Sequence, residues 1–201
     1  MPRKYSMQAR STAVEETRQR IVDATVELHN EQGISGTSMQ DVADRAGVAL
    51  ATVYRHFPSL DELIPACGGR NLELNPPPTA AVFDGLETGE QRIAALVAAL
   101  HANYERGSRS YEVAIAEVHT IPVLARFMAE VSAHLADLVA TAAKPFKPDS
   151  TQLKLAVGLC DFLVWRALTA TGMTTKETTA AITRLLCASL GSGTNGNRGK
   201  A

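Results

Sequence analysis

The side chains best suited to chemistry in this sequence lie close together, within residues 38–63. A hydroxyl, a phenol, a guanidinium and an imidazole follow one another there, in Thr52, Tyr54, Arg55 and His56. Groups of these kinds hydrogen-bond to phosphate oxygens and to the edges of bases. The stretch therefore favours recognition of a nucleic acid, provided that a rigid element presents these side chains outward.

Two short helices are expected to position these groups. Ser38 can cap the first helix, because Asp41 at its third position can reach back to the amide of the cap. Gly47 then enters a left-handed backbone conformation without steric cost, so the chain can turn sharply. In the second helix, at about 50–56, Val53 points back at the first and leaves its polar neighbours outward. This pattern is typical of a helix-turn-helix, although any two amphipathic helices joined at a glycine share it.

Residues 41–63 resemble the signature of the tetracycline-repressor (TetR) family. In that family an apolar-Ala pair, Ala-Gly-Val, Thr-x-Tyr-x-His-Phe and an acidic-Leu pair recur in this order. Their counterparts here are Val42-Ala43, Ala46-Gly47-Val48, Thr52-Val53-Tyr54-Arg55-His56-Phe57 and Glu62-Leu63. The resemblance covers the first third of the chain, and the rest fits through helix content and length. It implies a ligand-responsive transcriptional regulator, most commonly a repressor, that binds a palindromic DNA operator.

The resemblance also implies roles for individual side chains. Tyr54 and His56 correspond to a phosphate-contacting pair, and Ser38 with its helix amides corresponds to a second phosphate clamp. Arg suits guanine, Gln suits adenine and small groups meet the thymine methyl, so the candidates for base contacts are Gln40, Leu50, Ala51, Thr52 and Arg55. Two alternatives stay open: Tyr54 as a partly buried core aromatic and Arg55 as a solvated surface cation.

Two positions depart from the family's pattern. Where the family often has Ser before the second helix, this chain has Ala49, which removes a hydroxyl cap. Where the family commonly has a phosphate-binding Lys, this chain has Leu60, which we expect to pack against apolar neighbours. The phosphate contact made by that Lys therefore stays open here.

The composition predicts an all-helical protein. The chain has 201 residues, of which 45% are hydrophobic and 5% aromatic, and Ala, Leu and Val are frequent. No apolar run reaches the roughly 18 residues of a membrane span, and the basic start lacks the apolar segment of a signal peptide. We therefore expect a cytoplasmic protein with no membrane partner. Cys67, Cys160 and Cys187 are widely spaced and odd in number, which favours reduced thiols over disulfides.

The charge balance excludes DNA binding driven by bulk charge. The whole chain has a formal net charge of −1. Residues 1–63 carry seven Lys and Arg against nine Asp and Glu, a balance of −2. Affinity must therefore come from placement, with helix amides, hydroxyls and a few cations meeting phosphates while the acids face away.

The sequence is expected to fold as an N-terminal three-helix bundle and a larger helical C-terminal domain. The predicted parts are a flexible basic arm at 1–11, which follows a groove or stays solvated, the helix-turn-helix domain at 12–58, a ligand-binding and dimerisation domain at 59–191, and a disordered tail at 192–201. Thr12 is expected to start the first long helix, and Pro65 to bend the fourth. Further helices are expected at 88–107, 110–119, 122–143, 150–170 and 175–190, after a linker at 71–80.

The resemblance implies a homodimer as well. In the family two helix-turn-helix units enter successive major grooves about 34–36 Å apart, because one unit offers too little surface for tight specific binding. The segments 150–170 and 175–190 are the natural interface, since a second copy would cover their extra apolar face.

A small-molecule effector is implied in the same way. In the family the middle helices surround an apolar pocket, and a ligand that favours one spacing of the two DNA-binding units shifts the equilibrium. The candidates to line that pocket are Leu96, Leu100, Tyr104, Phe127, Val131, Phe162 and Trp165, with His101, His119, Asp161 and Arg166 as polar anchors. The alternative for each apolar residue is a place in the core.

An enzyme is not expected from this sequence. Its five histidines are scattered, and it lacks HExxH and CxxC motifs and a Gly-rich phosphate loop. No metal or cofactor site is predicted. The competing interpretation is a helical adaptor or sequestering protein that keeps the scaffold without binding DNA, which the acidic balance, Ala49 and Leu60 favour.

Overall fold

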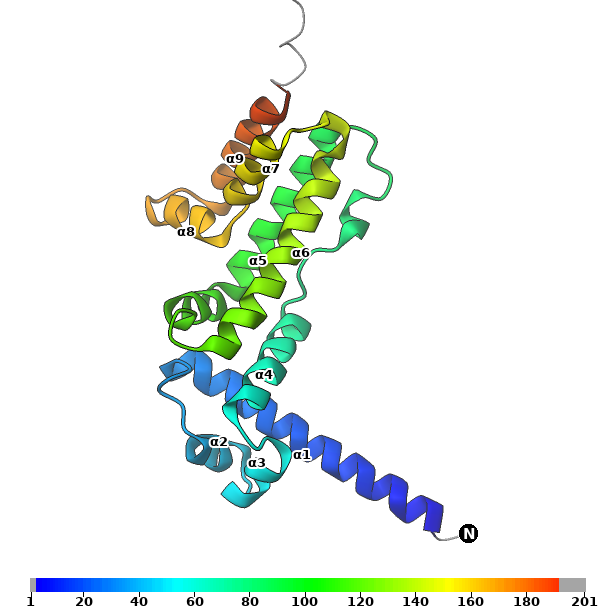
Figure 1. The fold of residues 1–201 in the computed structure, drawn as a ribbon, viewed down its shortest axis with the longest axis vertical. Helices are drawn as coiled ribbons and strands as arrows, with labels where there is room; N and C mark the ends of the chain where they lie inside the picture. The colour runs from blue at the N-terminus through cyan, green and yellow to red at the C-terminus, as the bar shows by residue number, and fades with distance from the viewer. Residues whose placement is uncertain (1–2, 192–201) are drawn as a thin grey trace, which may run out of the picture. The chain divides into compact units, whose positions relative to one another are not determined.

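The computed structural model describes the backbone of residues 3–191 and the side chains of residues 11–191. This part of the chain is all-helical, as the composition predicts, and contains no strand (Figure 1). In chain order its elements are α1 (Arg3–Gln32), α2 (Met39–Ala46), α3 (Leu50–His56), α4 (Leu60–Leu74), the 3-10 helix η1 (Ala80–Phe83), α5 (Gly89–Glu117), α6 (Pro122–Ala143), the 3-10 helix η2 (Lys144–Phe146), α7 (Ser150–Leu159), α8 (Phe162–Ala170) and α9 (Thr175–Gly191). The predicted tail at 192–201 lies outside the described residues.

The chain folds into two compact units. The first unit comprises Met1–Leu74 and Arg109–Met128, and the second comprises Asn75–Ser108 and Ala129–Ala201. The helices α5 and α6 therefore contribute to both units. This division differs from the predicted boundary between residues 58 and 59, because α4 packs against α1 within the first unit.

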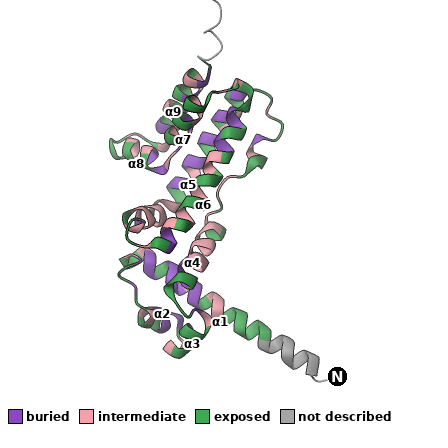
Figure 2. Cartoon of the chain, in the orientation of Figure 1, coloured by how far each residue is buried: buried purple, intermediate pink, exposed green. Residues whose placement is uncertain are grey.

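A small apolar core holds α1, α2, α3 and α4 together in the first unit. Its buried members are Ile21, Val22, Ala24, Leu28, Val42, Ala43, Ala46, Val53, Phe57 and Leu63. On α1 the buried residues lie within 21–29, whereas residues 11–16 are exposed (Figure 2). The C-terminal half of α1 thus backs the two short helices, as the sequence predicts.

The helix α1 begins at Arg3, well before the predicted start at Thr12. Residues 3–11 contain neither Pro nor Gly, and they include Met, Gln, Ala and Arg, which favour helices. Local sequence therefore offers no signal that would stop the helix before Thr12. The backbone of the predicted basic arm is helical from Arg3 onward.

The second unit has its own buried apolar side chains, drawn from α5, α6 and α9. Among the most deeply buried are Ile93, Leu96, Val97, Val139, Ala142, Ile182, Leu186 and Leu190. The helices α7 and α8 both pack against α9. Long amphipathic helices therefore bury this core, as their apolar spacing indicates.

The predicted single helix at 150–170 is wrong, because the chain forms α7 and α8 with a break at Cys160 and Asp161. Asp161 has an extended backbone, with φ −69° and ψ 147°. Its carboxylate accepts a hydrogen bond from the amide of Leu163 at 2.8 Å. Asp161 is therefore an N-cap that starts a new helix.

At Gly107 the opposite error occurs. The sequence predicts a helix end there, but α5 runs without a break from Gly89 to Glu117. A glycine inside a helix costs only about 1 kcal/mol relative to alanine, so favourable packing on either side outweighs it. Val113, beyond the glycine, is buried with Ile34 in a second cluster of the first unit.

The helix α4 starts at Leu60, as predicted, and continues through Pro65 to Leu74. The predicted linker from residue 71 therefore begins later in the chain, and the bend expected at Pro65 stays a prediction. Cys67 and Cys160 are buried free thiols and Cys187 is half-buried. None of the helices within residues 3–191 is long and apolar enough to cross a membrane.

Candidate nucleic-acid interface

The helix α2 begins at the capping box predicted around Ser38. The Ser38 hydroxyl accepts a hydrogen bond from the amide of Asp41 at 3.1 Å, and the Asp41 carboxylate accepts one from the amide of Ser38 at 2.9 Å. The same hydroxyl donates to the Asp41 carboxylate at 2.7 Å. These bonds hold the pKa of Asp41 below its usual value. The start of α2 is thus rigidly defined, with Ser38 exposed but already engaged.

A left-handed residue turns the chain from α2 towards α3. Gly47 has φ 64° and ψ 41°, as predicted for a helix end. The amide of Val48 donates to the carbonyl of Ala43 at 3.0 Å, which completes the usual glycine cap. Ala49 then precedes α3 without a side-chain hydrogen bond, so this helix lacks the hydroxyl cap, as expected.

The helix α3 buries one residue fully and leaves the others exposed or half-buried. Val53 is fully buried in the core. By contrast, Tyr54 is 48% exposed, which excludes the alternative of a core aromatic. Arg55 is also exposed and lies 3.4 Å from the hydroxyl of Thr52. None of the residues of α3 is acidic.

The other candidates for DNA contact are also accessible. Gln40 and Ala51 are exposed, whereas Leu50, Thr52 and His56 are half-buried. Leu50 packs in part against the core of the first unit, and Gln40 donates to the carboxylate of Asp44 at 2.8 Å. All eight predicted side chains therefore lie on one pair of adjoining helices, and their contacts with DNA stay predictions.

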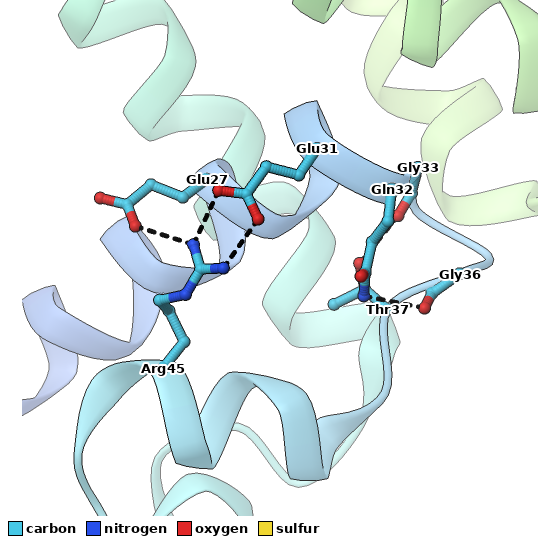
Figure 3. Close-up of polar contacts among 7 residues, drawn as sticks. All are labelled: Glu27, Glu31, Gln32, Gly33, Gly36, Thr37 and Arg45. Carbon is cyan, nitrogen blue, oxygen red and sulfur yellow. Dashed lines mark hydrogen bonds and ion pairs between the residues drawn. The ribbon is translucent and has the colours of Figure 1, made fainter.

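Three acids of α1 are paired with cations of other helices, and Figure 3 shows two of them, Glu27 and Glu31. Arg45 of α2 lies 2.7 Å from Glu31 and 3.2 Å from Glu27, both on α1. These hydrogen bonds lower the pKa of Glu31 and raise that of Arg45. Arg70 of α4 pairs in the same way with Asp23 of α1, at 2.7 Å. The negative balance of this region is therefore compatible with a DNA-binding surface on α3.

Leu60 contradicts the expectation that it packs. It lies in the first turn of α4, and its side chain is 47% exposed. The apolar positions that do face inward on this helix are Leu63, Ile64 and Cys67, three to seven residues further on. Leu60 is therefore a surface leucine, at the position for which the resemblance commonly implies a lysine.

In the second unit four predicted pocket residues come together as an aromatic cluster. Tyr104 packs edge-on against Phe162, with ring centroids 5.5 Å apart, and lies 6.0 Å from Trp165 and 6.2 Å from His101. The Tyr104 hydroxyl donates to the carbonyl of Cys160 at 2.7 Å. Burial lowers the pKa of His101 to about 4, so its ring is neutral near pH 7. The indole Nε1 of Trp165 is buried and has no hydrogen-bond partner among the described residues.

The remaining pocket candidates are dispersed. Leu96 and Leu100 are buried in the second unit, Val131 is half-buried and Arg166 is exposed. Asp161 caps α8. His119 and Phe127 belong to the first unit, where His119 is exposed and the Phe127 ring packs against Gly68 of α4.

Sequence reasoning missed a polar group of the first unit, Glu117 at the end of α5. Its carboxylate accepts hydrogen bonds from the amides of Ile34 and Ser35, each at 2.7 Å. Burial raises the pKa of Glu117, but the bonds from Ser35 and Ile34 and the nearby His29 outweigh it, so the pKa lies below its usual value. No local pattern could have found this contact, because Ser35 and Ile34 lie 82 and 83 residues before Glu117 in the sequence.

Among the described residues, no group of three or more His, Cys, Asp or Glu side chains could hold a metal ion. One groove of the second unit runs between α5 and α9 and is lined mainly by alanines and threonines, including Ala94, Ala98 and Thr179. None of the predicted ligand residues lines this groove. The polar surface of α2 and α3 therefore remains the clearest candidate site.

Comparison with known proteins agrees with this picture. Residues 21–67 match the family described as "Bacterial regulatory proteins, tetR family". The HTH-type transcriptional repressor KstR of Mycolicibacterium smegmatis is 43% identical over 63 residues, which is 31% of this chain and 31% of that protein. The chain thus matches only about a third of this relative's length.

Solved structures extend the similarity beyond that segment. A member of the TetR family from Streptomyces coelicolor is 27% identical, covers 85% of this chain and 98% of its own, and has a TM-score of 0.63. The multidrug binding protein EbrR, solved with imidazole, is 26% identical, covers 84% of this chain and 93% of its own, and has a TM-score of 0.57. The family model and the relative place the similarity to TetR-family regulators in the segment that holds α2 and α3, and the solved structures extend the likeness of fold over most of the chain.

Proposed function

We propose that this protein is a cytoplasmic transcriptional regulator that binds a palindromic DNA operator as a homodimer, as a repressor released by a small apolar or amphipathic effector. The observation that carries the proposal is the presentation of α3. Val53 anchors the helix while Tyr54 and Arg55 face outward, and no acid interrupts that surface. An α-helix presented in this way fits the major groove.

A dimer is supported by apolar residues of the second unit that lack cover. Leu155 of α7, Leu163 of α8 and Leu185 of α9 are 49%, 54% and 55% exposed. Large apolar side chains on neighbouring helices are typical of a surface that a second copy covers. Two copies would also supply the two α3 helices that a palindrome requires.

An apolar effector is supported by the aromatic cluster around Tyr104. The cluster offers stacking surfaces and holds a neutral His101, so it suits an uncharged or weakly polar molecule. The unpartnered Nε1 of Trp165 could donate one hydrogen bond to such a molecule. The similarity to a multidrug binding protein agrees with this class of effector.

The proposal is tested by selecting duplexes from a random-sequence pool with the purified protein and measuring their binding by gel shift. We expect a palindromic sequence and an affinity that falls steeply with salt. Arg55→Ala should weaken binding to the selected duplex about tenfold or more and relax the preference at one base pair. The matched control, Arg126→Ala, removes an exposed cation from α6 and should leave binding unchanged.

A helical adaptor without DNA binding is the second candidate, favoured by the uncapped start of α3 and by exposed Leu60. If the purified protein enriches no duplex at low salt, the adaptor is the better description. A stable monomer at micromolar concentration in light scattering would refute the dimer.

A further inference from the structure

The loop between α1 and α2, residues 33–38, is bound by a side chain that lies far from it in the sequence. Glu117, the last residue of α5, receives the amide of Ile34 on one carboxylate oxygen and the amide of Ser35 on the other, each at 2.7 Å. Hydrogen bonds to an ionised acceptor are shorter and stronger than neutral ones. The carboxylate therefore clamps two consecutive backbone groups of the loop.

The loop is shaped to receive this carboxylate. Gly33 has φ 86°, and a Cβ atom there would lie 2.8 Å from the Glu117 carboxylate. Ile34 is buried next to Val113 of α5 and Leu124 of α6. Any side chain at position 33 would therefore disturb both the backbone and the clamp.

The last turns of α5 also bind α1 and α4. Arg109 donates from Nε to the carbonyl of Asn30 in α1 at 2.6 Å. The Ser110 hydroxyl lies 3.0 Å from the side-chain oxygen of Asn30 and 3.2 Å from that of Asn71 in α4. The last turns of α5 are thus tied to α1, to α4 and to the loop, all within the first unit.

We propose that Glu117 is a positioning residue for DNA recognition, which sets the orientation of α2 and α3 by fixing the α1–α2 loop. This inference rests on the proposed function. The loop is the only covalent path from α1 to the cap at Ser38, so its two anchored amides determine where α2 begins. Releasing them removes one restraint on the loop, so α2 and α3 can shift together relative to α1.

Glu117→Gln tests the proposal, because it keeps the size of the side chain. It removes the negative charge and leaves one accepting oxygen in place of two. The control Glu130→Gln removes the same charge from an exposed position of α6. Affinity is measured for the duplex that the unchanged protein selects from a random pool and for a scrambled duplex. We expect Glu117→Gln to weaken the selected duplex about tenfold and to leave the scrambled duplex unchanged, with no effect of the control.

The ratio of the affinities for the selected and the scrambled duplex distinguishes a misplaced α3 from partial unfolding. Partial unfolding would lower the active fraction and so weaken both duplexes equally, whereas a misplaced α3 weakens only the selected one. Glu117→Asp keeps the charge but is too short to reach both amides, and it should lower the ratio as well. An unchanged ratio in both variants would overturn the proposal, as would an equal loss on both duplexes.

A second readout does not depend on DNA. We expect the amides of Ile34 and Ser35 to exchange with solvent at least about tenfold faster in Glu117→Gln than in the unchanged protein, measured by NMR. Unchanged exchange at these amides would overturn the clamp itself. If the unchanged protein selects no duplex while these amides still respond, the proposed function fails and the clamp stands.

Discussion

Two tyrosines show how differently the two units use the same side chain. Tyr54 of α3 is 48% exposed, whereas Tyr104 of α5 is 3% exposed. The Tyr104 hydroxyl is satisfied by a carbonyl 56 residues away, and its ring packs against Phe162. Tyr54 lies on a helix that follows the left-handed Gly47 and buries Val53, both within seven residues before it.

The first unit thus uses its tyrosine on an exposed helix surface, whereas the second uses its tyrosine in the buried core. Contacts close in sequence decide which side chains of a short helix face outward, because its caps fix where it starts and ends and the burial of one residue fixes its inner face. An interior polar group needs a partner, and in the second unit that partner comes from a distant helix. Mutations should therefore affect stability differently in the two units. Four tests of this difference follow, from the largest expected change in stability to the smallest.

Truncating the aromatic cluster should have the largest effect on stability. We expect Trp165→Ala to lower the free energy of unfolding by about 3–5 kcal/mol, because it removes a buried ring and leaves a cavity. Tyr54→Ala should stay within about 0.5 kcal/mol while DNA binding is lost. Urea unfolding measures the stability of both variants, and gel shift measures their DNA binding. Equal destabilisation by the two variants would contradict the stated difference between an exposed Tyr54 and a buried aromatic cluster.

The second largest loss of stability is expected at acidic pH, from the buried His101 of the second unit. Burial holds the pKa of His101 at about 4, against 6.5 in the unfolded chain, so below pH 6.5 the unfolded state takes up a proton that the folded state refuses. Stability is therefore fully present above pH 6.5 and falls as the pH drops towards 4. Between pH 7 and pH 5 the loss from this histidine is about 2 kcal/mol. His101→Gln should remove that share of the pH dependence, and His119→Gln, at an exposed position, should not.

The third largest effect on stability is expected from a substitution in the turn between α2 and α3. A Cβ atom at Gly47 would meet nothing within 4 Å, so the cost of Gly47→Ala comes from its left-handed backbone alone, about 1–2 kcal/mol. Gly69 inside α4 also has open space but an ordinary backbone, and Gly69→Ala should be neutral or stabilising by up to about 1 kcal/mol. Thermal unfolding distinguishes the two. A neutral Gly47→Ala would show that the turn does not define α3.

Removing the cap of α2 should have the smallest of these effects. Ser38→Ala leaves the Asp41 amide without its acceptor and should cost about 1 kcal/mol. Ser38→Asn keeps a capping oxygen and should restore most of the stability. Identical melting curves for the two variants would argue that the capping box is incidental.

Much of the first unit could be predicted from neighbouring residues. The cap at Ser38, the left-handed Gly47, the limits of α3 and the outward Arg55 all follow from contacts within a few residues. Such contacts leave their mark in sequence spacing, which is why the resemblance to the family was also confined to this part of the chain.

The errors have two causes. At Gly107 packing outweighs a local signal, because α5 continues through the glycine. At 150–170 a local signal was missed, because the carboxylate of Asp161 caps a new helix and divides the predicted one. Leu60 was expected to pack, yet its turn of α4 faces solvent and Leu63 fills the core instead.

By itself the sequence determined an all-helical chain, the pair α2 and α3, and the residues that this pair presents to solvent. The tertiary structure alone decided that acids of α1 are neutralised by Arg45 and Arg70, that Tyr104 meets Phe162, and that Glu117 holds the loop before α2. The physical reason is range: caps and turns involve backbone groups within a few residues, whereas salt bridges, ring contacts and the Glu117 clamp join helices that only the folded chain brings together.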